Sequence, residues 1–305
     1  MTASIIAVKD FTKKYGDFAA VDNISFEVEE GAIFAFLGPN GAGKSTTINT
    51  LCTILDKTGG ELFINGHDVS KQKDKVRSDI GIVFQESTLD SKLTVEENLK
   101  FHCKFYNVPD KEVSDRINFV LDLVDLQDWR KAPIGGLSGG MKRRVEIARG
   151  LVHYPKVLFL DEPTAGLDPQ TRANVWNYIY KLQKQRNITI FLTTHYMDEA
   201  EISTSVAIID HGKLAAFGTP EELKSKFSMS QVKVKTSRTE ALAEYLNRNE
   251  IRYQKTEDCL NIYSKDTHEI IDILTAFKES ILDFEATKGS LNDVFLKVTG
   301  REIRE

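Results

Sequence analysis

The chain has 305 residues, 41% of them hydrophobic, with 40 basic and 45 acidic side chains and a net charge of −5, as is typical of a globular protein long enough for two domains. This charge argues against a general attraction to nucleic acid, and the three separated cysteines indicate neither a disulfide framework nor a zinc site. Because no apolar run approaches the roughly 18 residues of a membrane span and the first residues lack a signal-peptide pattern, we expect a cytosolic protein that meets a membrane only through a partner.

The chain opens with a segment rich in predicted strands. Residues 5–9, 24–28 and 33–37 have strand-like apolar patterns, with turn signals between them. Tyr15 falls in a predicted loop between the first two strands. Its ring could stack on a purine, but a surface tyrosine that binds nothing is an equally good interpretation of the sequence.

A phosphate-binding pattern follows the strand at 33–37. Residues 38–46 read GPNGAGKST and fit G-x-x-x-x-G-K-[ST]. Glycines let backbone N–H groups approach an anion, and the helix expected over 44–55 directs its positive dipole end to the same place. Lys44 should then reach the β- and γ-phosphates of a nucleotide, and Ser45 should bind Mg²⁺. A glycine-rich turn that binds nothing is disfavoured by the strand before it and the helix after it.

Two further strands and a helical insertion come next. Strands are predicted at 61–64 and 80–84, and the second ends at Gln85, where an amide could contact Mg²⁺ or a water molecule. From residue 86 to about 154 the apolar residues fall at helical spacing. We therefore expect a helical subdomain inserted between strands of the core.

A second glycine-rich segment lies inside this insertion. Ser138, Gly139 and Gly140 stand where a helix is expected to begin, just before a basic run at 142–144. This is another anion-binding arrangement, and it would be redundant with the first if both served one phosphate in one chain. A flexible linker with a serine N-cap is the alternative interpretation.

Charged residues also follow the next two strands. The apolar strand at 157–160 ends in Asp161 and Glu162, whose side chains should point to opposite sides and therefore take different roles, a metal contact and a base. A solvated acidic turn is the alternative. Asp168 is predicted to cap a helix that continues to about residue 186, and capping could be its whole role. His195 follows a strand at 188–193 and could sense a γ-phosphate or be a structural histidine.

The remaining sequence predicts a small second domain. Strands at 206–209 and 214–217 and a short helix from residue 219 complete a nucleotide-binding domain at 1–227, with its helical subdomain at about 86–154. Residues 228–305 form the accessory domain, in the order strand, helix, two strands, helix, strand, helix, which resembles a ferredoxin-like α+β module. The elements expected there are 232–235, 240–249, two strands within 251–264 around a turn at Glu257-Asp258, 267–278, 281–287 and 291–298. No catalytic pattern is evident in it.

Taken together, the motifs occur in the order and context of an ABC-type ATPase subunit, and this resemblance covers residues 1 to about 225. The motifs are residues 38–46, Gln85, 137–140, 158–162, 167–168 and His195. The resemblance implies an α/β nucleotide-binding domain with a phosphate-loop core, an antiparallel β subdomain and a helical subdomain. It also implies that two subunits enclose two ATP molecules head to tail. The serine-glycine signature of one subunit would then face the phosphate loop of the other, which explains the redundancy.

The resemblance also implies a role for each motif residue. Glu162 would be the general base, with Lys44, Gln85 and His195 taking part in catalysis, and Asp168 would bridge the subunits. The Mg²⁺ ligands would be Ser45, Gln85 and Asp161. The subunit's own ATP would be contacted by Tyr15, through stacking on adenine, and by Gly38, Pro39, Asn40, Gly41, Ala42, Gly43, Lys44, Ser45, Thr46, Gln85, Asp161 and His195. Ser138, Gly139 and Gly140 would contact the partner's ATP. Met141 departs from the glutamine often found after this signature, and we expect catalysis to survive because the neighbouring serine and glycines supply the anion-binding groups.

Longer matches resemble the daunorubicin-resistance type of drug-exporter ATPase. They are FQE at 84–86, SGGMKRR at 138–144, DPQTR at 168–172 and LNDVFL at 291–296. This resemblance implies drug or antibiotic efflux through a separate type-2 membrane permease, contacted near residues 86–105, by a protein held at the inner face of the cell membrane. Export of a lipid, polysaccharide or ion is the alternative. A soluble ABC ATPase acting on ribosomes or DNA is disfavoured, because there is one cassette without a long coiled-coil insertion, so no nucleic-acid partner is expected.

Overall fold

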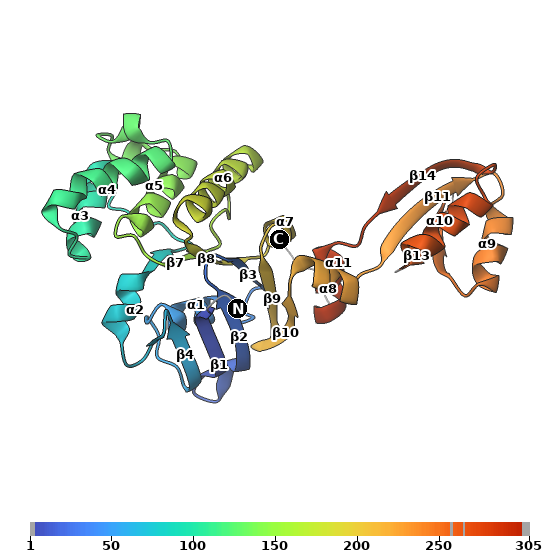
Figure 1. Ribbon diagram of the computed structural model, residues 1–305, viewed down its shortest axis with the longest axis horizontal. Coiled ribbons are helices and arrows are strands. Elements are labelled where there is room, and N and C mark those ends of the chain that lie inside the picture. Colours follow the sequence, from blue (N-terminus) through green and yellow to red (C-terminus); the bar gives the residue numbers. More distant parts are fainter. Residues whose placement is uncertain (1–3, 257–258, 265, 301–305) are drawn as a thin grey trace. The chain divides into compact units, whose positions relative to one another are not determined.

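The computed structural model describes residues 4–256, 259–264 and 266–300, and these residues form two compact units that divide between Phe217 and Gly218 (Figure 1). The predicted turn at Glu257-Asp258 lies outside the described residues, as do residues 1–3 and 301–305 at the two ends of the chain. In the part of the chain that is described, no helix has both the length and the apolar composition that a membrane crossing requires.

The division falls before helix α8 (Pro220–Phe227), whereas the sequence placed the boundary after it. α8 packs against the last helix, α11 (Leu291–Thr299), and Leu223 of α8 is buried, as are Val294 and Phe295 of α11. This contact joins distant parts of the sequence, so the division into compact units and the linker pattern at 228–230 differ by the one helix α8.

A six-stranded sheet forms the centre of the first unit, in the order β10-β9-β3-β8-β7-β6. The pairs β9-β3, β3-β8, β8-β7 and β7-β6 are parallel. Every residue of β3, β7 and β8 is buried, as expected for parallel strands covered on both faces. The strands are β3 (Ile33–Leu37), β6 (Ile80–Val83), β7 (Val157–Asp161), β8 (Thr189–Thr194), β9 (Ser205–Asp210) and β10 (Lys213–Gly218).

A smaller antiparallel sheet packs against this one and confirms the predicted β subdomain. Its order is β2-β1-β4-β5, with β1 (Ser4–Tyr15), β2 (Phe18–Glu29), β4 (Gly59–Ile64) and β5 (His67–Asp68). Phe26 of β2 stacks on Phe34 of β3 with ring centroids 5.3 Å apart, and Phe191 of β8 lies 4.9 Å from Phe34. This aromatic cluster therefore fixes the smaller sheet onto the strand that leads into the phosphate loop.

Helices complete the first unit and confirm the predicted helical insertion. Those of the insertion are α3 (Val95–Phe105), α4 (Asp110–Leu123) and α5 (Gly139–Leu151), and they lie beside one another in Figure 1. Elsewhere in the unit are α1 (Lys44–Leu51), α2 (Lys73–Asp79), α6 (Pro169–Arg186) and α7 (Met197–Glu201). α1 is shorter than predicted, because the chain leaves the helix at Cys52 and Thr53 has a positive φ of 62°.

The second unit contains a four-stranded antiparallel sheet in the order β12-β13-β11-β14. β11 and β12 run in the same direction with β13 between them, which is the split βαβ arrangement predicted from the sequence. Helices α9 and α10 cover one face, where Leu242, Leu246 and Ile273 join strand residues in a buried core. The elements are β11 (Ser230–Thr236), α9 (Thr239–Arg248), β12 (Arg252–Lys255), β13 (Leu260–Ser264), α10 (Thr267–Ala276) and β14 (Ile281–Thr287).

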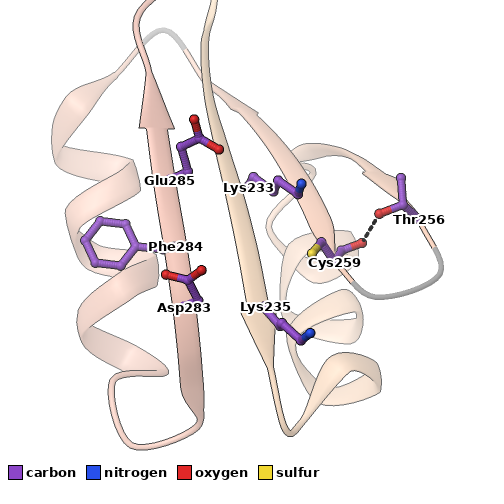
Figure 2. A pocket seen from close by; sticks show the side chains of 7 residues that line it. All are labelled: Lys233, Lys235, Thr256, Cys259, Asp283, Phe284 and Glu285. Atoms are coloured by element: carbon purple, nitrogen blue, oxygen red, sulfur yellow. Dashed lines mark hydrogen bonds between the residues drawn. The ribbon is translucent and has the colours of Figure 1, made fainter.

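The sheet of this unit also carries a shallow hollow, shown in Figure 2. In the register of β11 and β14, Lys233 is opposite Glu285 and Lys235 is opposite Asp283. Opposite charges on neighbouring strands stabilise the sheet through cross-strand pairs. The lining of the hollow therefore contains two basic and two acidic side chains.

Candidate active site

The phosphate loop lies between the carboxyl end of β3 and the start of α1. A Cβ atom on Gly38 would lie 2.4 Å from the carbonyl oxygen of Ile209, and one on Gly43 would lie 2.6 Å from that of Ala20. Gly43 also has a φ of 111°, which favours glycine. Gly43 is the N-cap of α1 and brings no side-chain cap to it, so the first N–H groups of the helix are available to an anion.

The side chain of Lys44 folds back against the phosphate loop. Its side chain is buried, and Nζ donates hydrogen bonds to the carbonyl oxygens of Gly38 at 2.7 Å and Pro39 at 3.2 Å. Burial lowers the pKa of Lys44, while the nearby carboxylates of Glu162 and Asp161 oppose that shift. The ammonium group therefore lies where the loop carbonyls hold it beside the two acidic residues.

Asp161 and Glu162 follow each other at the carboxyl end of β7 but have different surroundings. Asp161 is 8% exposed and accepts a hydrogen bond from the Thr193 hydroxyl of β8. Burial raises the pKa of Asp161, and the Thr193 hydrogen bond partly opposes this shift. Glu162 has a positive φ of 45° and its N–H donates to the backbone oxygen of Thr193 at 3.2 Å and to the side-chain oxygen at 3.1 Å.

The side chain of Glu162 is the point where the predicted catalytic residues meet. Its Oε2 accepts a hydrogen bond from Nε2 of Gln85 at 3.2 Å. Its Oε1 lies 3.5 Å from Nδ1 of His195 and 3.8 Å from Nζ of Lys44. The fold therefore brings together one residue from the start of α1, at position 44, and three that follow β6, β7 and β8, at positions 85, 162 and 195.

The remaining predicted residues lie outside this cluster. Tyr15 ends β1 instead of lying in a loop. The residue is 49% exposed, and Nζ of Lys13 lies 5.0 Å from the centroid of its ring. Ser138 is exposed and caps α5, accepting a hydrogen bond from the N–H of Met141. Asp168 is exposed and caps α6 through the N–H of Thr171 at 3.0 Å. Both capping interpretations are therefore seen, and the residues stay open to solvent.

Sequence reasoning missed Arg143, on the first turns of α5. Arg143 is 7% exposed, and its guanidinium contacts the backbone that carries Glu162 and the residue before Gln85. The basic run at 142–144 was visible, but a charged run is normally a solvated surface. Only the structure distinguishes the buried arginine from its neighbours.

A groove begins next to Gln85, between β6 and α3, with a volume of about 370 Å³. Its lining is largely aromatic and apolar, and Phe101 is 64% exposed there. The half-buried His102 and His153 also line the groove, and partial burial lowers the pKa of both histidines to about 4. The ring of His153 stacks on Tyr106 at 3.7 Å. The lining residues are Ile82, Phe84, Thr88, Asp90, Leu93, Asn98, Phe101, His102, Tyr106, Arg149, Gly150 and His153.

Both units are similar to known protein families. The ABC transporter family model matches residues 21–165, and the model of the C-terminal domain of DrrA1-3-like ATP-binding proteins matches residues 218–299. Among solved structures, cbiO1 of Clostridium perfringens, part of the ABC transporter complex cbiONQ, is 30% identical with a TM-score of 0.68, covering 80% of this chain and 95% of that one. A dimeric bacterial ABC transporter cassette is 28% identical with a TM-score of 0.64, covering 70% and 98%.

Curated relatives extend the similarity over the whole chain. The probable multidrug ABC transporter ATP-binding protein YbhF of Escherichia coli (strain K12) is 40% identical over 223 residues, but the match spans only 38% of that protein and 73% of this chain. The Nod factor export ATP-binding protein I of Ralstonia nicotianae is 35% identical, with 99% of this chain and 95% of that protein covered. The daunorubicin/doxorubicin resistance ATP-binding protein DrrA of Streptomyces peucetius is also 35% identical, with 97% and 92% covered. The chain therefore belongs to the ABC transporter ATPases and, within them, to the exporter type represented by the DrrA and Nod factor export proteins.

Proposed function

We propose that two copies of this chain close head to tail around two ATP molecules and drive a separate type-2 membrane permease that exports a drug or antibiotic. The observation that carries the proposal is the convergence of Lys44, Gln85 and His195 on the carboxylate of Glu162, beside a phosphate loop whose helix N-terminus is available to an anion. This arrangement suits transfer of a γ-phosphoryl group to water.

The chain's own residues divide the chemistry of hydrolysis. Lys44, now held by loop carbonyls, would exchange them for the phosphate oxygens of ATP. Glu162 would orient and deprotonate the attacking water, with Gln85 and His195 holding its carboxylate in place. The oxygen atoms of Ser45, Gln85 and Asp161 are the ligand type that Mg²⁺ prefers, and Ser45 is exposed at the first turn of α1. Bound Mg²⁺ would neutralise charge on the transferred phosphoryl group.

The second copy accounts for the second anion-binding arrangement. Ser138 and Gly139 are exposed at the N-terminus of α5, where N–H groups could meet the γ-phosphate of ATP held by the other subunit. Asp168 is exposed as well and could contact the partner. The dimeric state of the solved cassette that is 28% identical supports this arrangement.

The permease would dock in the groove that begins beside Gln85. An exposed Phe101 over a largely apolar lining suits a short amphipathic helix of the partner. The segment that starts at Gln85 forms one edge of this groove, so docking and ATP hydrolysis would share a structural element. The protein would then be cytoplasmic and peripheral on the inner face of the membrane.

The cargo is proposed from the relatives, which are named for multidrug transport, daunorubicin/doxorubicin resistance and Nod factor export. A lipid, polysaccharide or ion could be carried by the same mechanism. Vesicles that contain the permease and this chain distinguish these cargoes, because only a true cargo should both accumulate across the membrane with ATP and stimulate hydrolysis.

The catalytic part of the proposal is tested with Glu162→Gln. Removing a positioned base costs about 10²- to 10⁴-fold in rate, so the ATPase rate should fall by that factor while ATP binding is kept. The variant should then form an ATP-dependent dimer, measured by light scattering. Glu86→Gln, which changes an exposed carboxylate one residue after Gln85, is the control and should hydrolyse at the parental rate. A Glu162→Gln protein with parental activity would remove Glu162 from the role of base.

A further inference from the structure

The side chain of Arg143 donates hydrogen bonds to four backbone carbonyl groups around the candidate active site. All five N–H groups of a guanidinium can donate hydrogen bonds in a fixed planar arrangement. In Arg143 each of them has an acceptor. Nε donates to the carbonyl oxygen of Pro163 at 2.7 Å, Nη1 to that of Phe84 and to Oε2 of Glu146 at 2.9 Å, and Nη2 to the carbonyl oxygens of Asp161 at 3.1 Å and Glu162 at 3.2 Å.

These carbonyl groups belong to the two segments that carry the proposed catalytic residues. Glu162 has a left-handed backbone conformation, which is unfavourable for a residue with a side chain and persists only where its surroundings hold it. Thr193 holds the N–H of Glu162 and Arg143 holds its carbonyl oxygen. The carbonyl of Phe84 belongs to the peptide bond that leads directly into Gln85, so the same guanidinium also fixes the start of that residue.

Arg143 links these segments to the helix that begins at the serine-glycine signature. Ser138 is the N-cap of α5, and Arg143 lies on the same helix, little more than one turn later. Glu146, one further turn along, is 3% exposed and supplies the negative charge that Arg143 needs in a buried position. A displacement of this end of α5 would therefore be passed to the backbone at Glu162 and Gln85.

We propose that Arg143 is a positioning residue for ATP hydrolysis. Its guanidinium fixes the backbone at Glu162 and Gln85 in a conformation that depends on the position of α5, the helix that begins at the serine-glycine signature. The inference rests on the proposed function for the roles of Glu162 and Gln85. It extends that function by giving each subunit a connection between the signature, which meets the partner's ATP, and the base, which meets its own.

Arg143→Lys tests this role, because lysine keeps the charge but has a single nitrogen that cannot reach acceptors on both segments. A misplacement of about 1 Å at a catalytic group can cost about 10²-fold in rate, so kcat should fall by about 10- to 100-fold. KM for ATP should change by less than about threefold, since an interaction that matters only for the chemical step lowers kcat alone. A kcat close to the parental value in folded protein would overturn the proposal.

Arg144→Lys is the matched control on the same helix. Arg144 donates to the carbonyl oxygens of Val124 and Asp125, away from the strand ends, so kcat should stay within about twofold of the parental value. An equal loss in both variants would indicate a general effect of arginine on the stability of α5 and would contradict a positioning role.

A double-mutant cycle adds a readout that a merely structural role would not change. If Arg143 acts through Glu162, then Arg143→Lys should lower the residual rate of Glu162→Gln by less than about threefold, since residues that act as a unit are not additive. Full multiplication of the two losses would contradict the proposal. A parental rate in Glu162→Gln would instead refute the proposed base, so the two failures are distinguishable.

If Arg143→Lys does not yield folded protein, Glu146→Gln is the variant that tests the proposal. The amide keeps the shape of the side chain but removes the charge that pairs with Nη1 of Arg143, and charge-assisted hydrogen bonds are about twice as strong as neutral ones. We expect a smaller fall of kcat in the same direction with KM for ATP unchanged. Parental kcat in this variant would overturn the proposal.

Discussion

Glu96 should stabilise the helical insertion through its contacts with three cations. It lies in the first turn of α3 and is 5% exposed, and its carboxylate contacts Arg130 at 3.0 Å, Lys100 at 2.8 Å and also Lys131. Hydrogen bonds from Arg130, Lys100 and Lys131 hold the pKa of Glu96 far below its ordinary value. Glu96→Gln keeps the shape of the side chain and removes only the charge.

The size of the effect follows from the exposure of the three cations. Breaking a buried ion pair costs about 3 to 5 kcal/mol. Lys131 is 81% exposed and Lys100 is 51% exposed, so water replaces much of what they lose, and we expect about 2 to 3 kcal/mol. For a unit of this size that is a fall in melting temperature of about 4 to 12 °C.

Thermal and urea unfolding of the parental protein and of the Glu96→Gln variant measure this effect. Glu112→Gln is the control, because Glu112 also pairs with an arginine, but its side chain is 42% exposed, so about 1 kcal/mol or less should be lost. Because the pKa of Glu96 is lowered on folding, its contribution is present above about pH 4.5 and is lost as the pH falls below it. The reasoning would be refuted if Glu96→Gln lowered the free energy of unfolding by less than about 0.5 kcal/mol at pH 7. It would also be refuted if the substitution lowered that free energy as much at pH 3 as at pH 7.

Two further predictions concern buried titratable groups. The pKa values of His102 and His153 are lowered to about 4 by burial, so the unfolded chain binds more protons between about pH 4 and 6.5, and the free energy of unfolding should rise with pH over that range. His153→Phe, which keeps a ring against Tyr106, should flatten this slope in a urea titration, and an unchanged slope would be contrary to the account. Burial raises the pKa of Cys52 and Cys103, so iodoacetamide and peptide mass spectrometry should find the partly exposed Cys259 modified first, and equal labelling of Cys52 would contradict the burial described here.

The nucleotide-binding motifs could be predicted because their residue types are tied to local backbone chemistry. Glycines at 38 and 43 are required by close approach or positive φ, and the carboxyl ends of parallel strands gather side chains at one edge. The departure at Met141 matters little for capping, because it is the backbone N–H of this residue that donates to Ser138. Such features can be recognised in one sequence because they depend on near neighbours.

What could not be predicted depends on contacts between distant residues. Arg143 looks like its neighbours in sequence, but four of the five acceptors of its guanidinium are backbone carbonyl groups at the ends of two distant strands. α8 belongs to the second unit because it packs against α11, although a linker pattern follows it. Tyr15 lies in a longer strand than its apolar pattern indicated, because β1 continues through register shifts along β2. Each of these differences comes from tertiary packing that overrides a local signal.

The partnership with a membrane exporter is tested most directly by capturing the partner. Tagged Glu162→Gln protein is purified from gently solubilised native membranes with ATP present, and the chains that accompany it are identified. Phe101→Asp in the same background alters the groove, and Trp129→Asp changes an exposed aromatic residue outside the groove lining as the control. We predict that a multispanning membrane protein is captured with Glu162→Gln, is kept with Trp129→Asp and is lost with Phe101→Asp. Ribosomal or nucleic-acid material in place of a membrane protein would contradict the exporter account.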